Sequence, residues 1–122
     1  APDPQPPVGS CGTVGANTPL AVNVPVVSCD GRFSLVMQGD GNLVLYGPFG
    51  AMWHTYTNGH AGASAVFQGD GNLVVYSAWG TPLWYSGTHG NHNATLAVQD
   101  DGNLVIYASN GTPLWASGTH GW

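Results

Sequence analysis

The sequence predicts an all-β domain built from a repeated unit. Three nearly identical segments follow one another at residues 38–46, 68–76 and 99–107, with spacings of 30 and 31 residues. Within each unit, β-branched and aromatic runs alternate with Gly, Asn, Asp and Pro, which is typical of short strands joined by tight turns. No segment has the sustained apolar period of an amphipathic helix. We therefore expect about four strands per unit and about twelve in all.

The low content of positively charged residues limits the kinds of molecule that the protein can bind. The chain has 122 residues, enough for one domain with a core, and 43 % of them are hydrophobic. With only one Lys or Arg, the protein lacks the positive charge to bind a run of phosphates or an anionic membrane. The sequence contains no stretch of about 20 apolar residues that could form a transmembrane helix. The composition thus argues against nucleic-acid binding and membrane insertion.

The N-terminal part has a different character from the repeats. Four prolines among the first seven residues predict an extended arm over 1–10, followed by a single domain over 11–122. The absence of an initial Met fits the mature end of a secreted protein as well as an artificial boundary. A secreted, extracellular setting favours a Cys11–Cys29 disulfide over two buried thiols. No CxxC or neighbouring His pattern suggests a metal site at these cysteines.

The segment before the first repeat, residues 8–37, must supply what the three units lack. Two alternating apolar runs lie there, one of Leu20, Val22, Val24 and Val26 and one of Phe33, Leu35 and Met37. Alternation of this kind predicts strands with one buried face.

Each unit presents five polar or small residues at alternate positions, which places them on one face of the chain. These candidate binding residues are Gln38, Asp40, Asn42, Val44 and Tyr46 in the first unit, Gln68, Asp70, Asn72, Val74 and Tyr76 in the second, and Gln99, Asp101, Asn103, Val105 and Tyr107 in the third. The opposite face predicts the core, formed by Met37, Leu43 and Leu45, by Phe67, Leu73 and Val75, and by Val98, Leu104 and Ile106.

Such a polar face suits a ligand rich in hydroxyl groups. A sugar hydroxyl both donates and accepts hydrogen bonds, while Asp accepts, Asn and Gln do both, and the Tyr phenol donates. A bond from a hydroxyl to a carboxylate is charge-assisted and therefore stronger, and Val offers a small surface to the C–H face of a pyranose ring. The other interpretation is an ordinary solvated face with Asx turns. The recurrence of all five residues in three units favours a binding face.

The pattern Gln-x-Asp-x-Asn-x-Val-x-Tyr resembles the bulb-type, or snowdrop-type, mannose-binding lectins over residues 20–122. The resemblance implies a β-prism II fold, in which three four-stranded antiparallel sheets surround a pseudo-threefold axis. It places Trp53, Trp84 and Trp115 in the central core. It also implies binding of α-mannose without a metal or other cofactor, and the intact motifs imply three sites. The motif glutamines would contact O3, the Asp and Asn residues O2, the tyrosines O4, and the valines C3 and C4.

The resemblance also suggests partners and a source. Expected ligands are mannose, oligomannose glycans, mannans and mannosylated glycoproteins. Gly41 stands where plant members carry a Cys, so a microbial source is more plausible than a plant one. Some relatives dimerise by exchanging a C-terminal strand, so the chain is expected to be a monomer or such a homodimer.

Other functions fit the residues less well. The chain has no Lys, no Glu and no Gly-x-Ser-x-Gly elbow, and its motif Asp residues lie in separate units, so an enzyme is not expected. The Asp-Gly-Asn segments lack the further oxygen ligands and the closing Glu of a calcium loop, so no metal site is predicted. The remaining alternative is a β-prism scaffold that recognises proteins and keeps vestigial sugar sites.

Overall fold

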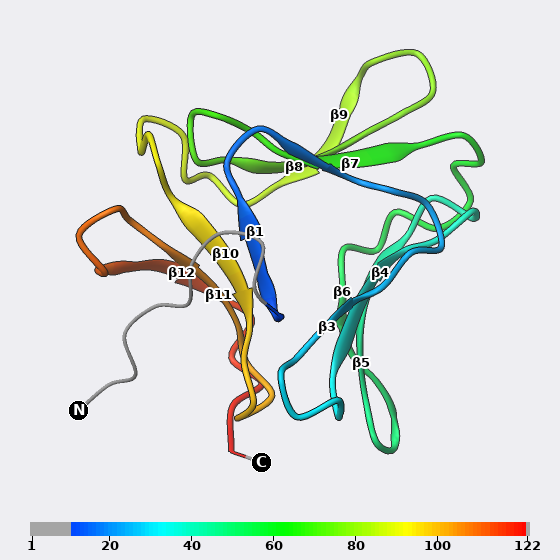
Figure 1. The fold of residues 1–122 in the computed structure, drawn as a ribbon. Helices are drawn as coiled ribbons and strands as arrows, with labels where there is room; N and C mark the ends of the chain where they lie inside the picture. Colours follow the sequence, from blue (N-terminus) through cyan, green and yellow to red (C-terminus); the bar gives the residue numbers. More distant parts are fainter. Residues whose placement is uncertain (1–10, 122) are drawn as a thin grey trace.

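Three four-stranded antiparallel sheets surround a shared apolar centre in the computed structural model, which describes residues 11–121 (Figure 1). The strands are β1 (Thr13–Gly15), β2 (Thr18–Leu20), β3 (Val26–Val27), β4 (Ser34–Met37), β5 (Leu43–Gly47), β6 (Gly50–His54), β7 (Ser64–Phe67), β8 (Leu73–Tyr76), β9 (Pro82–Tyr85), β10 (Thr95–Val98), β11 (Leu104–Tyr107) and β12 (Pro113–Ala116). The strand orders are β1-β10-β11-β12, β2-β7-β8-β9 and β3-β4-β5-β6. The predicted all-β, β-prism II arrangement is confirmed, and the arm 1–10 lies outside the described residues.

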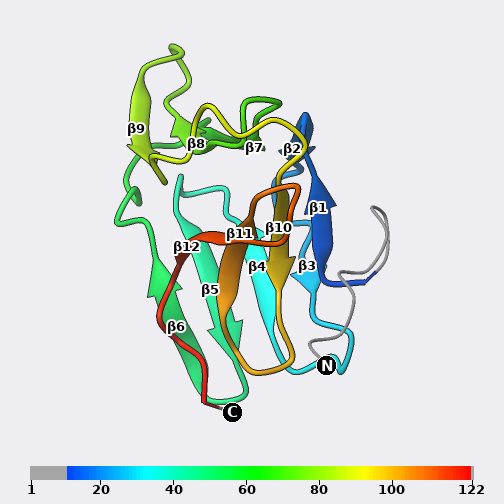
Figure 2. The ribbon, with the colours of Figure 1, turned by 90° about the vertical axis from the view of Figure 1, so that its left-hand side faces the viewer.

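The described residues before β4 contribute one strand to each sheet. β1 pairs with β10, β2 with β7 and β3 with β4. Each repeat unit forms only three strands, so the expectation of four per unit is wrong, although the described residues do contain twelve strands. The reason is that the segments between units are turns, in which Tyr56, Gly59 and Gly62 adopt positive φ. At the other end of the chain, β12 pairs with β11 of the same chain (Figure 2).

The alternating run from Leu20 to Val26 does not form a continuous strand, contrary to its apolar pattern. β2 ends at Leu20, and Asn23 follows in the left-handed conformation with a φ of 63°. Pro25 has no N–H to donate to a ladder. Val24 is 58 % exposed, so this run does not bury one face. The segment instead carries the chain from the second sheet to the third, between β2 and β3.

The core lies between the sheets, where their inward faces meet. All nine residues predicted to point inward are at most 4 % exposed. Trp53, Trp84 and Trp115 pack against this core and meet edge to face, with ring centroids 5.4, 5.3 and 5.7 Å apart. Aromatic pairs of this geometry contribute about 0.5–1.5 kcal/mol each beyond the burial of area. The tryptophans therefore join β6, β9 and β12 at the axis.

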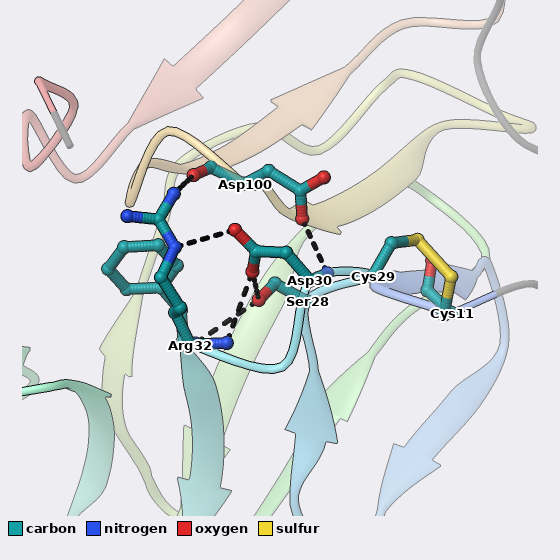
Figure 3. Close-up of a disulfide and its surroundings, with 7 residues drawn as sticks. Cys11, Ser28, Cys29, Asp30, Arg32 and Asp100 are labelled. Atoms are coloured by element: carbon teal, nitrogen blue, oxygen red, sulfur yellow. Dashed lines mark hydrogen bonds and ion pairs between the residues drawn. A yellow bond between two sulfur atoms is a disulfide. The ribbon is translucent and has the colours of Figure 1, made fainter.

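A disulfide and a polar cluster fasten the start of β1 to the loop before β11 (Figure 3). The predicted Cys11–Cys29 disulfide is confirmed. The N–H of Asp30 donates to Oδ1 of Asp100 at 3.0 Å, and Nη2 of Arg32 donates to the carbonyl of Asp100 at 2.5 Å. Nε of Arg32 also pairs with the Asp30 carboxylate at 2.6 Å. Arg32, the only Lys or Arg in the sequence, thus holds this junction.

The Asp30 carboxylate gives the junction a dependence on pH. Hydrogen bonds from the backbone N–H and the side chain of Arg32, and from the Ser28 hydroxyl, lower its pKa from 3.8 to about 2. A lowered pKa stabilises the folded state above the ordinary pKa, and this stabilisation is lost as the pH falls toward 2. In thermal melts, we expect wild type to exceed Asp30→Asn in Tm at pH 5, with the difference shrinking by pH 2. A constant difference across this range would contradict the assignment.

Two glycines of the second repeat both have a positive φ, but only one of them is crowded by neighbouring atoms. Their substitution by Ala therefore distinguishes the cost of crowding from the cost of backbone strain. Gly71 and Gly90 have φ values of 88° and 83°, but a Cβ on Gly71 would lie 2.4 Å from the carbonyl of Asn91, whereas a Cβ on Gly90 meets nothing within 4 Å. Gly90→Ala should cost about 1–2 kcal/mol through left-handed strain alone. Gly71→Ala should cost about 3 kcal/mol or more, because the backbone must also move. If chemical denaturation gave the same loss of unfolding free energy for both variants, the contact with Asn91 would not contribute.

Candidate functional site

Each motif begins in a hairpin turn and continues into the third strand of a sheet. The three motifs therefore lie on β5, β8 and β11 and their preceding turns, one on each side of the prism (Figure 1). We call them the first, second and third sites, at residues 38–46, 68–76 and 99–107. The strand alternation places their side chains on the face opposite the core, as predicted.

The turn has the same hydrogen bonds in all three sites. In the first, the N–H of Gly41 donates to the carbonyl of Gln38 at 3.1 Å, and the N–H of Gln38 donates to the carbonyl of Asn42 at 2.9 Å. Gly41 has a φ of 93°, which closes the turn in a conformation that Gly adopts without strain. The Gly-Asn step of the motif therefore sets the turn that precedes the strand.

The acidic residue of each motif uses one oxygen to shape this turn. Oδ1 of Asp40, Asp70 and Asp101 accepts the N–H of the motif Asn at 3.0, 3.0 and 2.9 Å. This is an Asx turn, as the simpler interpretation of the sequence proposed. Its geometry holds the second carboxylate oxygen in a fixed place beside the strand.

The glutamine and tyrosine of each motif contact each other. Nε2 of Gln38, Gln68 and Gln99 donates to the phenol oxygen of Tyr46, Tyr76 and Tyr107. This bond leaves the amide oxygen as an acceptor and the phenol O–H as a donor. A register shift in the pairing with the outer strand also occurs at each motif tyrosine.

The asparagine has a structural role that sequence reasoning missed. In the second site, Oδ1 of Asn72 accepts bonds from the Ser86 hydroxyl and from the N–H groups of Gly87 and Thr88, at 3.1, 3.0 and 3.2 Å. In the third site, Asn103 does the same with Ser117, Gly118 and Thr119. The repeated Ser-Gly-Thr after each of these tryptophans was the available signal. Nδ2 of Asn72 and of Asn103 has no protein partner within residues 11–121.

In the first site, Oδ1 of Asn42 likewise accepts from the Thr55 hydroxyl and the Thr57 N–H, both at 3.2 Å, but the partner of Nδ2 is different. Nδ1 of His54 accepts two hydrogen bonds, one from Nδ2 of Asn42 at 3.1 Å and one from the N–H of Tyr56 at 3.2 Å. Because two donors converge on Nδ1, the ring proton must sit on Nε2. The Tyr56 ring covers the imidazole, with centroids 3.9 Å apart. His54 thus belongs to the surroundings of the site, although nothing in the repeat pattern assigns it there.

The motif valines form a covered floor. Val44, Val74 and Val105 are each 3 % exposed, although they lie outside the core cluster. A cavity of about 180 Å³ lies over Val74, bounded by Gln68, Asn72, Tyr76, Pro82 and Tyr85. The sequence predicted the floor of this site, while Pro82 and Tyr85 come from the outer strand β9 and carried no motif signal.

Among residues 11–121, no three His, Cys, Asp or Glu side chains are placed to hold a metal ion. Within the same residues, each buried side-chain nitrogen and oxygen has a hydrogen-bond partner. The described part of the chain also has no helix that could cross a membrane.

Three four-stranded antiparallel sheets around a pseudo-threefold axis define a β-prism II protein, and solved structures identify relatives of this class. The chain is similar to the mannose-specific agglutinin from snowdrop (Galanthus nivalis) bulbs, with 37 % identity, 91 % of this chain and 99 % of that chain covered, and a TM-score of 0.73. It is also similar to a monomeric monocot mannose-binding lectin from Gastrodia elata, with 34 % identity, 90 % of this chain and 99 % of that chain covered, and a TM-score of 0.81. A Marasmius oreades lectin is 30 % identical, with 91 % of this chain and 93 % of that chain covered and a TM-score of 0.81.

These identities and coverages show that the chain belongs to the family of bulb-type mannose-binding lectins. Lectins bind carbohydrates without converting them, so this is not a family of enzymes. A scan against protein-family models and a search of curated proteins give no match.

The two roles of the asparagine can be separated by mutation. Asn103→Ala leaves the donors of Ser117, Gly118 and Thr119 without their acceptor and should lower the free energy of unfolding by about 2–3 kcal/mol. Asn103→Asp keeps an acceptor oxygen but loses Nδ2, so most of the stability should remain. Urea denaturation measures both variants. If Asn103→Asp lowered the free energy of unfolding as much as Asn103→Ala, the structural role of Oδ1 would be contradicted.

Proposed function

We propose that the protein binds α-D-mannose and mannose-rich glycans, without a metal ion, through its three motifs. The supporting observation is that polar side chains of each motif use one group to shape the site and leave a second group for a ligand. This holds for the glutamine, the aspartate and the tyrosine in all three motifs, and for the asparagine in the second and third. The glutamine amide oxygen, the second aspartate oxygen and the phenol O–H form a set of acceptors and donors that complements neighbouring sugar hydroxyls.

The roles expected from the family pattern fit this set. The glutamine oxygen would accept O3–H, the aspartate oxygen would accept O2–H, and the tyrosine O–H would donate to O4. The free Nδ2 of Asn72 and Asn103 would donate to O2, so the axial O2 of mannose would be held from two sides. In the first site Nδ2 of Asn42 is already bonded to His54, so Asp40 carries the contact with O2 there. The motif valine would lie under C3 and C4.

Each site alone should bind weakly. Four or five hydrogen bonds and one small apolar contact correspond to a Kd of about 1 mM, or about −4 kcal/mol. The three motifs lie on different sheets (Figure 1), and their side chains lie outside the core cluster. They would therefore engage separate branches or chains, which raises the avidity for clustered glycans by about 10²- to 10⁴-fold where the spacing matches.

The proposed partners are oligomannose glycans, mannans and mannosylated glycoproteins. We infer a secreted, extracellular protein, because the Cys11–Cys29 disulfide persists in oxidising surroundings. The different position of this disulfide from the one expected in plant members supports a microbial source. The proposed oligomeric state is a monomer or a homodimer formed by exchange of the C-terminal strand.

Calorimetry with methyl α-mannoside tests the proposal. We expect about three sites per chain with Kd values of about 1 mM, unchanged by EDTA. The matched variants are Asp40→Asn, Asp70→Asn and Asp101→Asn, since Asn keeps the oxygen that accepts the backbone N–H but removes the charge. Each should weaken one site by about tenfold or more through loss of a charge-assisted bond.

The triple variant is the control. It should retain the wild-type melting curve and show no measurable heat with the sugar. A folded wild-type protein that gives no heat with methyl α-mannoside and none with branched mannan would refute sugar binding and favour the scaffold alternative.

A further inference from the structure

The three sites share their motif but not the residues that flank it on the same face. On the inner neighbouring strand, the partner of the motif valine is Val36 in the first site and Val66 in the second, but Ala97 in the third. On the outer strand, the partners are His54, Tyr85 and Ala116. The third site is therefore bordered on both sides by a single methyl group, where the other two carry larger side chains.

A cavity of about 420 Å³ opens beside the third site, on the side of Ala97. It adjoins the motif side chains Gln99, Asp101 and Tyr107 and extends over Ala97 toward the start of β1. Its remaining lining consists of Cys11, Gly12, Thr13, Cys29, Val98 and Asp100. The volume lies in the range of about 300–1,000 Å³ that is typical of ligand sites. The cavity beside the second site is smaller, about 180 Å³, and lies on the other flank, against β9.

The far wall of this cavity is held rigidly. The Cys11–Cys29 disulfide joins the start of β1 to the turn that carries Asp30, and that turn is bonded to Asp100 through the Asp30 N–H and the Arg32 guanidinium (Figure 3). The carbonyl of Gly12 accepts the N–H of Val98 at 2.6 Å, which ties the wall to β10. A wall fixed before binding need not be ordered by the ligand, so less of the binding free energy is lost.

The wall is specific to the third site. Asp100 stands where the first two motifs have Gly39 and Gly69. One carboxylate oxygen of Asp100 accepts the N–H of Asp30, and the other has no protein partner within residues 11–121. The cavity thus combines an acceptor at one side with an apolar surface formed by Ala97 and the disulfide, which is the chemistry of a second sugar ring.

We propose that the third site binds two linked mannose residues, whereas the first and second sites bind one. The terminal residue occupies the motif, and the adjacent residue lies over Ala97 against the disulfide wall, with a hydroxyl donating to Asp100. This inference rests on the proposed mannose binding at the motifs. It makes the third site the one that distinguishes oligomannosides from single terminal mannose.

Two backgrounds isolate single sites for the test. Asp40→Asn with Asp70→Asn leaves the third site, and Asp40→Asn with Asp101→Asn leaves the second. Calorimetry compares methyl α-mannoside with α1→2-, α1→3- and α1→6-linked dimannosides in each background. At the third site, at least one dimannoside should bind about tenfold more tightly than the monosaccharide. At the second site, the ratio should stay near the statistical factor of about two.

The repeats supply the decisive variant and its control. In the third-site background, Ala97→Val introduces the residue that the other sites carry at this position, so it should fold normally and leave methyl α-mannoside binding unchanged. It should abolish the dimannoside advantage. Ala116→Val adds the same volume on the opposite flank, away from the cavity, and should keep the advantage.

The outcomes separate the two proposals. If methyl α-mannoside fails to bind the third-site background while the melting curve is normal, mannose binding itself is refuted there. If the monosaccharide binds but the dimannoside ratio is the same at both sites, or survives Ala97→Val, the second subsite is refuted and mannose binding stands.

Discussion

The burial of one face of every sheet against a common axis determines where each motif side chain points. Leu43 and Leu45 must reach the core, so the residues that alternate with them, Asn42, Val44 and Tyr46, face the opposite way. A shift of one residue in the register would bury the polar set and expose the apolar one. The hydrophobic core thus fixes the orientation of the binding face without contacting a ligand.

The asparagine links this orientation to the rest of the repeat. Its Oδ1 receives the donors of the turn that follows the next strand, as Asn72 does with Ser86, Gly87 and Thr88. The amide can then turn only its Nδ2 toward a ligand. One side chain therefore stabilises the fold and presents a donor, which explains why the motif contains an amide beside the carboxylate rather than two carboxylates. A second carboxylate would satisfy the turn but would offer no donor.

Period-two alternation made the core and the motif faces predictable, because both depend on local sequence. The nine inward residues follow directly from it, whereas the central position of the three tryptophans came from the family resemblance. Contacts between distant segments were not predictable in the same way. Cys29 and Asp100 border one cavity although they are 71 positions apart, and β1, β2 and β3 are too short to reveal which sheet each one joins. The alternating run from Leu20 to Val26 does not form one strand, because Asn23 adopts a left-handed conformation that interrupts the extended backbone.

The three sites share the motif residues that the repeat contains, but the residues beside the motifs differ. The fourth strand of each sheet comes from the unrepeated N-terminal segment, so the flank of each site is different by construction. Val36, Val66 and Ala97 occupy equivalent positions beside the motif valine, on the face away from the core cluster. A change at one of them alters the width of one site and leaves the shared core intact, since distant sites contribute nearly independently. The architecture therefore allows one site to specialise for a longer glycan while the other two keep a simpler ligand, because its flank is formed by Ala97 of β10 and by the start of β1.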